Sequence, residues 1–162
     1  MPEYTIRPLN PEDAQWVAQF IESRWHSSIV VGHGQVYYPH TLPGFVALQD
    51  DKPFGLLTYT IQHNDCEIVT IDSILPSHGV GTALIEAVKV VAEQNKCSRL
   101  WLITTNDNLN ALRFYQKRGF TLVAVYRNAL EQSRKIKPEI PLIGKDGIPL
   151  RDEIELEMPL NT

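Results

Sequence analysis

This sequence of 162 residues has few cysteines, no long apolar run and no surplus of basic charge. Its two cysteines, Cys66 and Cys97, show no metal-ligand spacing, so we expect buried thiols in a reducing compartment and no bound metal. No apolar run is long enough to cross a bilayer, and the chain does not begin with a basic and then apolar signal. A net charge of −4 argues against a nucleic-acid partner. We therefore expect a cytoplasmic protein that binds neither membranes nor nucleic acids.

The remaining composition is that of an ordinary globular domain, with 43% hydrophobic and 21% charged residues. We find no repeat, low-complexity tract or linker, which predicts a single domain over residues 4–160. Alternation and turn residues predict strands at 4–8, 45–49, 54–62, 66–74, 100–103, 120–126 and 153–160. Helical spacing and start signals predict helices after Asn10, over 79–94 and over 108–118. Residues 24–42 show no clear period and read as an exposed functional loop.

A glycine turn stands between the strand at 66–74 and the helix that follows it. Its sequence is Leu75-Pro76-Ser77-His78-Gly79-Val80-Gly81-Thr82. Such a strand, turn and helix aim several backbone N–H groups and the positive end of a helix dipole at one point, which suits a phosphate. Glycine is routine between strands and helices, so this turn alone is weak evidence of a binding site.

A second segment, Asn108-Leu109-Asn110-Ala111-Leu112-Arg113-Phe114-Tyr115-Gln116-Lys117-Arg118-Gly119-Phe120, lies about thirty residues further on. It matches an Asn-x-x-Ala-x-x-x-Tyr-x-x-x-Gly-Phe signature at every position. Together with the glycine turn, it resembles the GNAT superfamily of acyl-CoA-dependent N-acetyltransferases. The resemblance covers most of residues 4–160 and is strongest from Cys66 to Phe120.

The resemblance implies a mixed α/β (α+β) fold with a mostly antiparallel central sheet flanked by helices. It also implies acetyl-CoA as co-substrate, direct transfer in a ternary complex, and a small-molecule or peptide primary amine as acceptor. The coenzyme contacts that it implies fall on Ile74, Leu75, His78, Gly79, Val80, Gly81, Thr82, Asn108 and Phe114. The sequence leaves open whether the protein is a monomer or a homodimer.

One position departs from the family pattern. The residue three before the first glycine of the turn is usually Arg or Gln, and here it is Pro76; the loop is also shorter than usual. This departure keeps a second interpretation open, in which the chain is a non-catalytic acyl-CoA-binding sensor or regulatory module.

The resemblance implies Tyr115 as the general acid that protonates the leaving thiolate. Glu67 and Asp72, both on the strand before the glycine turn, are candidates for the base, and so is water. Glu67 is favoured because Cys66-Glu67-Ile68-Val69 resembles the corresponding stretch of histone-type members. A regular strand places the two acids on opposite faces, so both reach one site only if the strand is bulged.

The acceptor site is less well specified. His33, Tyr37 and Tyr38 on the early loop are candidates, together with Arg127, Arg134 and Lys135 on an insertion at about 127–150 before the last strand. Basic residues would suit an anionic group on the acceptor, but they equally fit a solvated helix face. The insertion reads equally well as a flap over the site or as a structural extension. Finally, Glu153, Glu155 and Glu157 form a row that would attract a cationic amine or simply face solvent.

Overall fold

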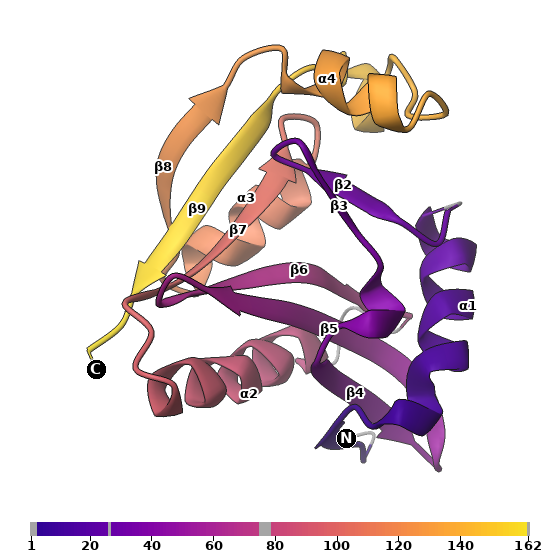
Figure 1. Cartoon of the computed structure of the whole chain (residues 1–162), viewed down its shortest axis with the longest axis vertical. Helices are drawn as coiled ribbons and strands as arrows, with labels where there is room; N and C mark the ends of the chain where they lie inside the picture. The colour runs from indigo at the N-terminus through magenta and orange to yellow at the C-terminus, as the bar shows by residue number, and fades with distance from the viewer. Residues whose placement is uncertain (1–2, 26, 75–78, 162) are drawn as a thin grey trace. The chain divides into compact units, whose positions relative to one another are not determined.

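A computed structural model describes residues 3–25, 27–74 and 79–161 (Figure 1). The chain forms two compact units. The first unit comprises Met1–Val30, Tyr38–Leu100 and Pro159–Thr162, and the second comprises Val31–Tyr37 and Trp101–Met158.

The first unit is built on an antiparallel meander. It contains β1 (Thr5–Pro8), β4 (Gly44–Gln49), β5 (Lys52–Gln62) and β6 (Asp65–Ser73), hydrogen-bonded in that order. Asp50 and Asp51 join β4 to β5, and His63 and Asn64 join β5 to β6, all four with positive φ. Two consecutive residues with positive φ match the twist of a tight hairpin. Both hairpins that the sequence predicted are confirmed.

Helix α1 (Ala14–Trp25) covers one face of this meander (Figure 1). It follows a short 3-10 turn, η1 (Pro11–Asp13), which Asn10 caps through a bond from the Glu12 N–H. Val17, Phe20 and Ile21 are buried in one cluster with Leu56 of β5, as helical spacing predicted. The even-numbered positions of β5 near Leu56 therefore face α1.

Helix α2 (Val80–Gln94) covers the opposite face. Val80, Leu84 and Val88 of the predicted apolar stripe are fully buried, and Ile85 and Ala92 extend it. Gly55 of β5 marks the contact, because a Cβ atom there would lie 3.3 Å from Val80. The odd-numbered positions of β5 near Gly55 therefore face α2.

The second unit contains most of β7 (Arg99–Thr105), then α3 (Leu109–Lys117), β8 (Thr121–Tyr126), α4 (Ala129–Ile136), the 3-10 turn η3 (Lys145–Gly147) and most of β9 (Glu153–Pro159). Its strands run in the order β7-β9-β8, with β8 and β9 antiparallel. The predicted fold class is confirmed: a mixed α/β fold with a mostly antiparallel sheet flanked by helices. No helix in the described ranges combines the length and apolarity needed to cross a bilayer.

Residues 24–42, which we expected to form an irregular loop, contain regular structure. This stretch contains the hairpin β2 (Val30–Gly32) and β3 (Gln35–Tyr37), followed by η2 (Pro39–Thr41). The strands have three residues each, too few to show a period of two. The signal that was missed is the turn itself, where His33 and Gly34 both take positive φ between valine-containing flanks.

Candidate active site

The glycine turn joins β6 to α2 in the first unit, as predicted. Helix α2 begins at Val80, directly after Gly79, whose φ of 74° lies in the left-handed region. No side chain of the described residues caps this helix, and its first turn carries no acidic residue. The N–H groups of that turn and the positive end of the helix dipole are therefore suited to an anion. Two of the predicted contacts, Leu75 and His78, lie outside the described residues.

The other predicted coenzyme residues of this unit differ in what they offer. Ile74 already donates its N–H to the carbonyl of Phe54 at 2.8 Å, so any backbone hydrogen bond to a pantetheine arm falls to its carbonyl group. The Val80 side chain is buried, which leaves its backbone as the contact group. Gly81 and Thr82 lie half-buried in the first turn.

A β-bulge in β6 changes the relation between the two candidate bases. Thr58 of β5 pairs with Thr70, but the next residue, Tyr59, pairs with Ile68, so β6 carries one extra residue, Val69. Glu67 is then opposite Thr60, and Asp72 is opposite Leu56. Thr60 and Leu56 lie on the same face of β5, and cross-strand partners share a face. The two carboxylates therefore lie on one face of the sheet, the face that α1 covers.

Asp72 is held by α1. Its oxygens accept from Arg24 Nε at 2.9 Å, from a terminal guanidinium nitrogen of Arg24 at 3.0 Å and from Trp25 Nε1 at 3.3 Å. The Ser73 N–H donates to it at 2.7 Å. The hydrogen bond to Asp72 raises the pKa of Arg24, while burial opposes that rise. Asp72 thus fixes the end of α1 to the end of β6. Nothing in the sequence pattern singled out Arg24 and Trp25 as its partners.

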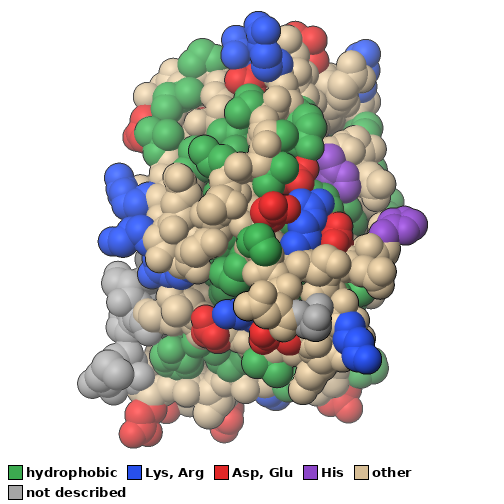
Figure 2. Space-filling view, turned by 90° about the vertical axis from the view of Figure 1, so that its left-hand side faces the viewer, with side chains coloured by type: hydrophobic (Ala, Val, Ile, Leu, Met, Phe, Trp, Pro, Cys, Tyr) green, Lys and Arg blue, Asp and Glu red, His purple; other side chains and the backbone are tan. Residues whose placement is uncertain are grey.

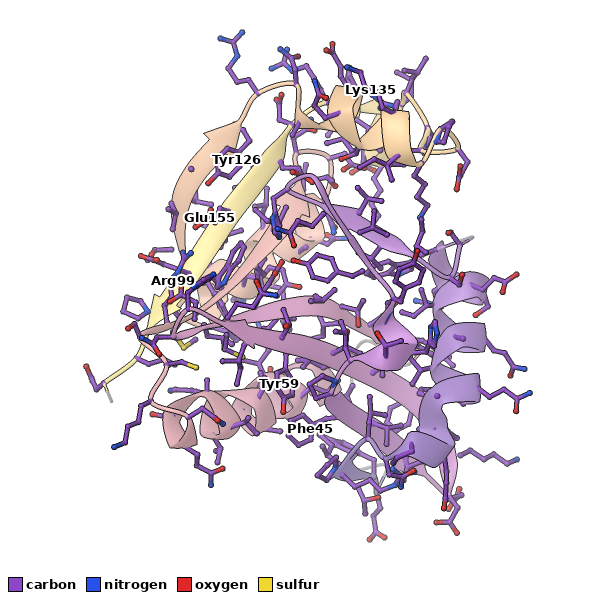
Figure 3. The ribbon with its side chains drawn as sticks, viewed as in Figure 1. Phe45, Tyr59, Arg99, Tyr126, Lys135 and Glu155 are labelled. Carbon is purple, nitrogen blue, oxygen red and sulfur yellow. The ribbon has the colours of Figure 1, made fainter. Side chains whose placement is uncertain are left out.

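Glu67 lies deeper in the same face, with 6% of its surface exposed. Its neighbour Cys66 points to the opposite face and is fully buried, and burial raises the pKa of that thiol to about 12. On the Cys66 face, Tyr59 stacks with Phe45 at 6.3 Å between ring centroids, and burial raises the pKa of the Tyr59 phenol (Figure 3). Cys97 is also a buried thiol rather than half of a disulfide, as predicted.

Helix α3 carries the second predicted group of residues, in the second unit. Asn108 caps it by accepting from the Ala111 N–H at 3.4 Å. The same oxygen accepts from Lys145 Nζ at 3.2 Å, and the Asn108 amide donates to Thr104 Oγ1 at 3.4 Å. Asn108 therefore has a structural task at this helix start, whether or not it also contacts a coenzyme.

Tyr115 is the one buried residue of α3, with 7% of its surface exposed. Its ring makes edge-on contacts with Phe114 at 5.4 Å and Phe120 at 5.6 Å. The guanidinium of Arg118 lies 3.9 Å from the centroid of the half-buried Phe114 ring. The helix ends as the Phe120 N–H donates to the Tyr115 carbonyl across Gly119, where φ is 100°.

The insertion is an ordered structure held by hydrogen bonds from side chains to the backbone. Arg134 donates to the carbonyl groups of Ile140 at 3.2 Å, Pro141 at 2.7 Å and Leu150 at 2.5 Å. Asp107, which follows β7, accepts from the Lys145 N–H at 2.9 Å. These contacts give Arg134 a structural task that the sequence did not predict. Arg127 and Lys135 are exposed.

His33 and Tyr37 lie together in the second unit. The Tyr37 hydroxyl and His33 Nε2 are 3.0 Å apart, and the His33 ring lies 5.3 Å from that of Trp101. The His33 N–H donates to the Glu153 carboxylate at 3.1 Å. Tyr38, by contrast, belongs to the first unit, where it is half exposed.

The row of glutamates on β9 is not a solvent-facing pattern. Glu153 and Glu155 have exposed fractions of only 3% and 8%. The Tyr126 hydroxyl of β8 donates to Glu155 at 2.6 Å (Figure 3). Acidic residues are rarely buried without partners. The alternation was read correctly, but polarity alone could not show that the His33 N–H and the Tyr126 hydroxyl bond to these glutamates.

A pocket of about 400 Å³ lies in the first unit, beside residues that the sequence did not single out. Leu9, Ala14, His40 and Leu42 are among its lining residues, and it lies between the start of α1 and η2. In the part of the chain that the structure describes, no group of three His, Cys, Asp or Glu side chains could hold a metal ion.

The family assignment follows from comparison with known proteins. Residues 10–120, which contain the glycine turn and all of the Asn108–Phe120 segment, match the model of the acetyltransferase (GNAT) family. The chain belongs to the GNAT family. The uncharacterized protein YdhI of Bacillus subtilis (strain 168) is 41% identical over 150 residues, covering 92% of this chain and 94% of YdhI.

Solved structures with the GNAT fold are similar along nearly the whole chain. An IAA acetyltransferase from Bacillus cereus ATCC 14579 superposes with a TM-score of 0.74 at 21% identity, covering 98% of this chain and all of that one. A GNAT family acetyltransferase from Elizabethkingia anophelis with acetyl-CoA bound gives 0.70 at 20% identity, covering 99% of this chain and all of that one. At this identity the likeness shows the fold.

Proposed function

We propose that this chain is an N-acetyltransferase that transfers the acetyl group of acetyl-CoA to a primary amine. The observation that carries the proposal is the start of α2, the helix that follows β6, directly after a left-handed Gly79, within a chain of the GNAT family. The backbone N–H groups and the positive dipole end at such a helix start suit the pyrophosphate of a coenzyme. The acetyl-CoA bound to the Elizabethkingia protein supports the same co-substrate.

The reaction is a direct attack of the neutral amine on the thioester carbonyl. A base removes a proton from the ammonium form of the acceptor, a C–N bond forms, the C–S bond breaks, and an acid protonates the leaving thiolate. Holding both substrates in one complex supplies part of the advantage over the reaction in water. This route needs no acyl-enzyme and no metal.

Glu67 is our candidate for the base, acting directly or through one water molecule. Asp72 lies on the same face, but Arg24, Trp25 and the Ser73 N–H already bond to its carboxylate. Those contacts favour Asp72 as a residue that holds α1 and β6 together. Tyr115 is our candidate for the acid, since a tyrosine hydroxyl is a proton donor that can serve as a general acid toward a leaving thiolate.

The function is tested by incubating the full chain with acetyl-CoA and a panel of amines and peptides, followed by mass spectrometry of both the amines and the protein. We expect an acetylated amine and an unmodified protein. Calorimetry with acetyl-CoA alone is run in parallel. Binding of acetyl-CoA without acetylation of any amine would instead identify a sensor module, and absence of binding would overturn the proposal.

A further inference from the structure

The outer strand of the second unit has an exposed apolar surface. Strand β8, with the sequence Thr-Leu-Val-Ala-Val-Tyr, ends the strand order β7-β9-β8. Exposed fractions are 55% for Leu122, 46% for Val123, 58% for Val125 and 42% for Tyr126. Figure 2 views the side on which β8 lies in Figure 1, and hydrophobic side chains gather in the upper part of that face.

The outer strand of the first unit is built differently. Strand β1 has only four residues, and they include Arg7 and Pro8. Short length, a cation and a proline are the usual means by which an edge strand avoids pairing with another chain. Strand β8 is longer, uncharged and free of proline. It carries one protective device, a bulge at Val123, where Leu122 pairs with Leu156 but Ala124 pairs with Glu155.

We propose that β8 is a homodimer interface, formed by antiparallel pairing of β8 with the same strand of a second copy around a two-fold axis. An antiparallel strand pair of identical chains is isologous, so one patch serves both copies. Exposed valine, leucine and tyrosine side chains suit such pairing because their contacts across a strand pair are stabilising.

The bulge makes β8 complementary to an antiparallel copy of itself. Because of the extra residue, Leu122 and Val125 both lie on the face of Leu156 and Ile154, while Thr121 and Tyr126 both lie on the face of the β9 glutamates. In a pairing centred between Val123 and Ala124, Leu122 meets Val125 of the second copy on one face, and Thr121 meets Tyr126 on the other. A regular strand would place the members of each such pair on opposite faces.

The flanking charges tolerate the same register. Arg127, which directly follows the strand, falls opposite the uncharged Phe120 of the second copy, and β8 itself carries no charge, so no like charges meet in the paired strands. A partner of other composition would need no such self-complementarity, which is why we assign the surface to a second copy. Six residues form a small interface, so the dimer should dissociate on dilution.

The test is sedimentation velocity of the full chain from about 1 to about 100 µM, where weak dimers dissociate. We expect a monomer at the low end and a dimer at the high end. Val125→Lys places a charge inside the paired strands and should weaken the dimer at least tenfold. Val90→Lys on α2, which changes a similarly exposed valine of the first unit, is the matched control and should leave the dimer unchanged. Circular dichroism verifies that both variants fold.

A second measurement fixes the strand pairing. Val125→Cys is labelled with a nitroxide, while Cys66 and Cys97 are buried and should not react. The register places the two labelled positions three residues apart along the paired strands, about 10 Å at a rise of about 3.4 Å per residue. A short label distance at high concentration supports the proposal. A monomer at every concentration, a dimer that Val125→Lys leaves intact, or a long label distance would overturn it.

Discussion

The two faces of β6 are built for different purposes. The face toward α1 carries Glu67 and Asp72, and the face toward α2 carries Cys66 and Ile68, both buried. The extra residue Val69 produces this division, because without it the two carboxylates would lie on opposite faces. The comparison teaches that one added residue in a strand can gather acidic groups on one side and leave the other side apolar for packing.

Glu67→Gln tests the polar face most severely. If Glu67 is the base, the amide cannot accept the proton, and turnover should fall by about a hundredfold or more. Initial rates at saturating acetyl-CoA measure the loss, and calorimetry should show nearly unchanged coenzyme affinity.

Asp72→Asn is the matched control on the same face. It should lower turnover less and lower the free energy of unfolding by about 1 kcal/mol, because the pair with Arg24 is partly exposed and partly screened. If Asp72→Asn abolishes turnover and Glu67→Gln does not, the roles that we assign to the two acids are reversed.

Tyr115→Phe tests the acid role that we propose for this residue of α3. The ring and its contacts with Phe114 and Phe120 are kept, and only the hydroxyl is lost. Turnover should fall by about a hundredfold, and acetyl-CoA affinity should hardly change. Near-normal turnover with chemistry rate-limiting would reduce Tyr115 to a packing residue.

Gly79→Val tests the start of α2, the helix that packs on the apolar face of β6. Valine is strained at a φ of 74° and crowds the start of the helix, so acetyl-CoA affinity should fall more than tenfold, about 1.4 kcal/mol. Gly34→Val introduces the same strain at a φ of 79° in the β2–β3 turn and should leave that affinity unchanged. Calorimetry on both folded variants decides, and equal affinities would contradict coenzyme binding at this turn.

On the apolar face of β6, we expect Cys66 not to react with thiol reagents in the folded protein. The folded pKa of Cys66, raised to about 12, lies above the unfolded value near 8.5, so the thiol stays protonated in the folded state at pH 8. A thiol reagent should therefore label neither Cys66 nor Cys97 until denaturant is added. The contribution of Cys66 to stability is fully present below about pH 8.5 and is lost as the pH rises toward 12. Rapid labelling of the native protein would show that this face opens.

The sequence predicted most of the fold because its signals were local. Paired turn residues such as Asp50 and Asp51 marked the hairpins, and Asn108 and Gly119 marked the two ends of α3. The bulge at Val69 was not predicted, because it is visible only in the pairing of β6 with β5. The short β2–β3 hairpin was not predicted, because strands of three residues are too short to show an alternating pattern.

The sequence could predict the role of a candidate site residue only where the residue type alone indicates that role. Arg134 read either as a cation for the acceptor or as part of a solvated helix face. Its hydrogen bonds go to three backbone carbonyl groups that the sequence does not bring together. Burial of Glu153 and Glu155 likewise depends on which elements pack against β9, which alternation does not reveal.

The most direct test of the central claim is the initial rate of thiol release from acetyl-CoA, measured with the full chain over a matrix of acetyl-CoA and amine concentrations. Direct transfer in a ternary complex predicts release that requires the amine, with double-reciprocal lines that intersect. Parallel lines would indicate an acetylated enzyme intermediate. Parallel lines, or release that is indifferent to every amine tested, would contradict the account.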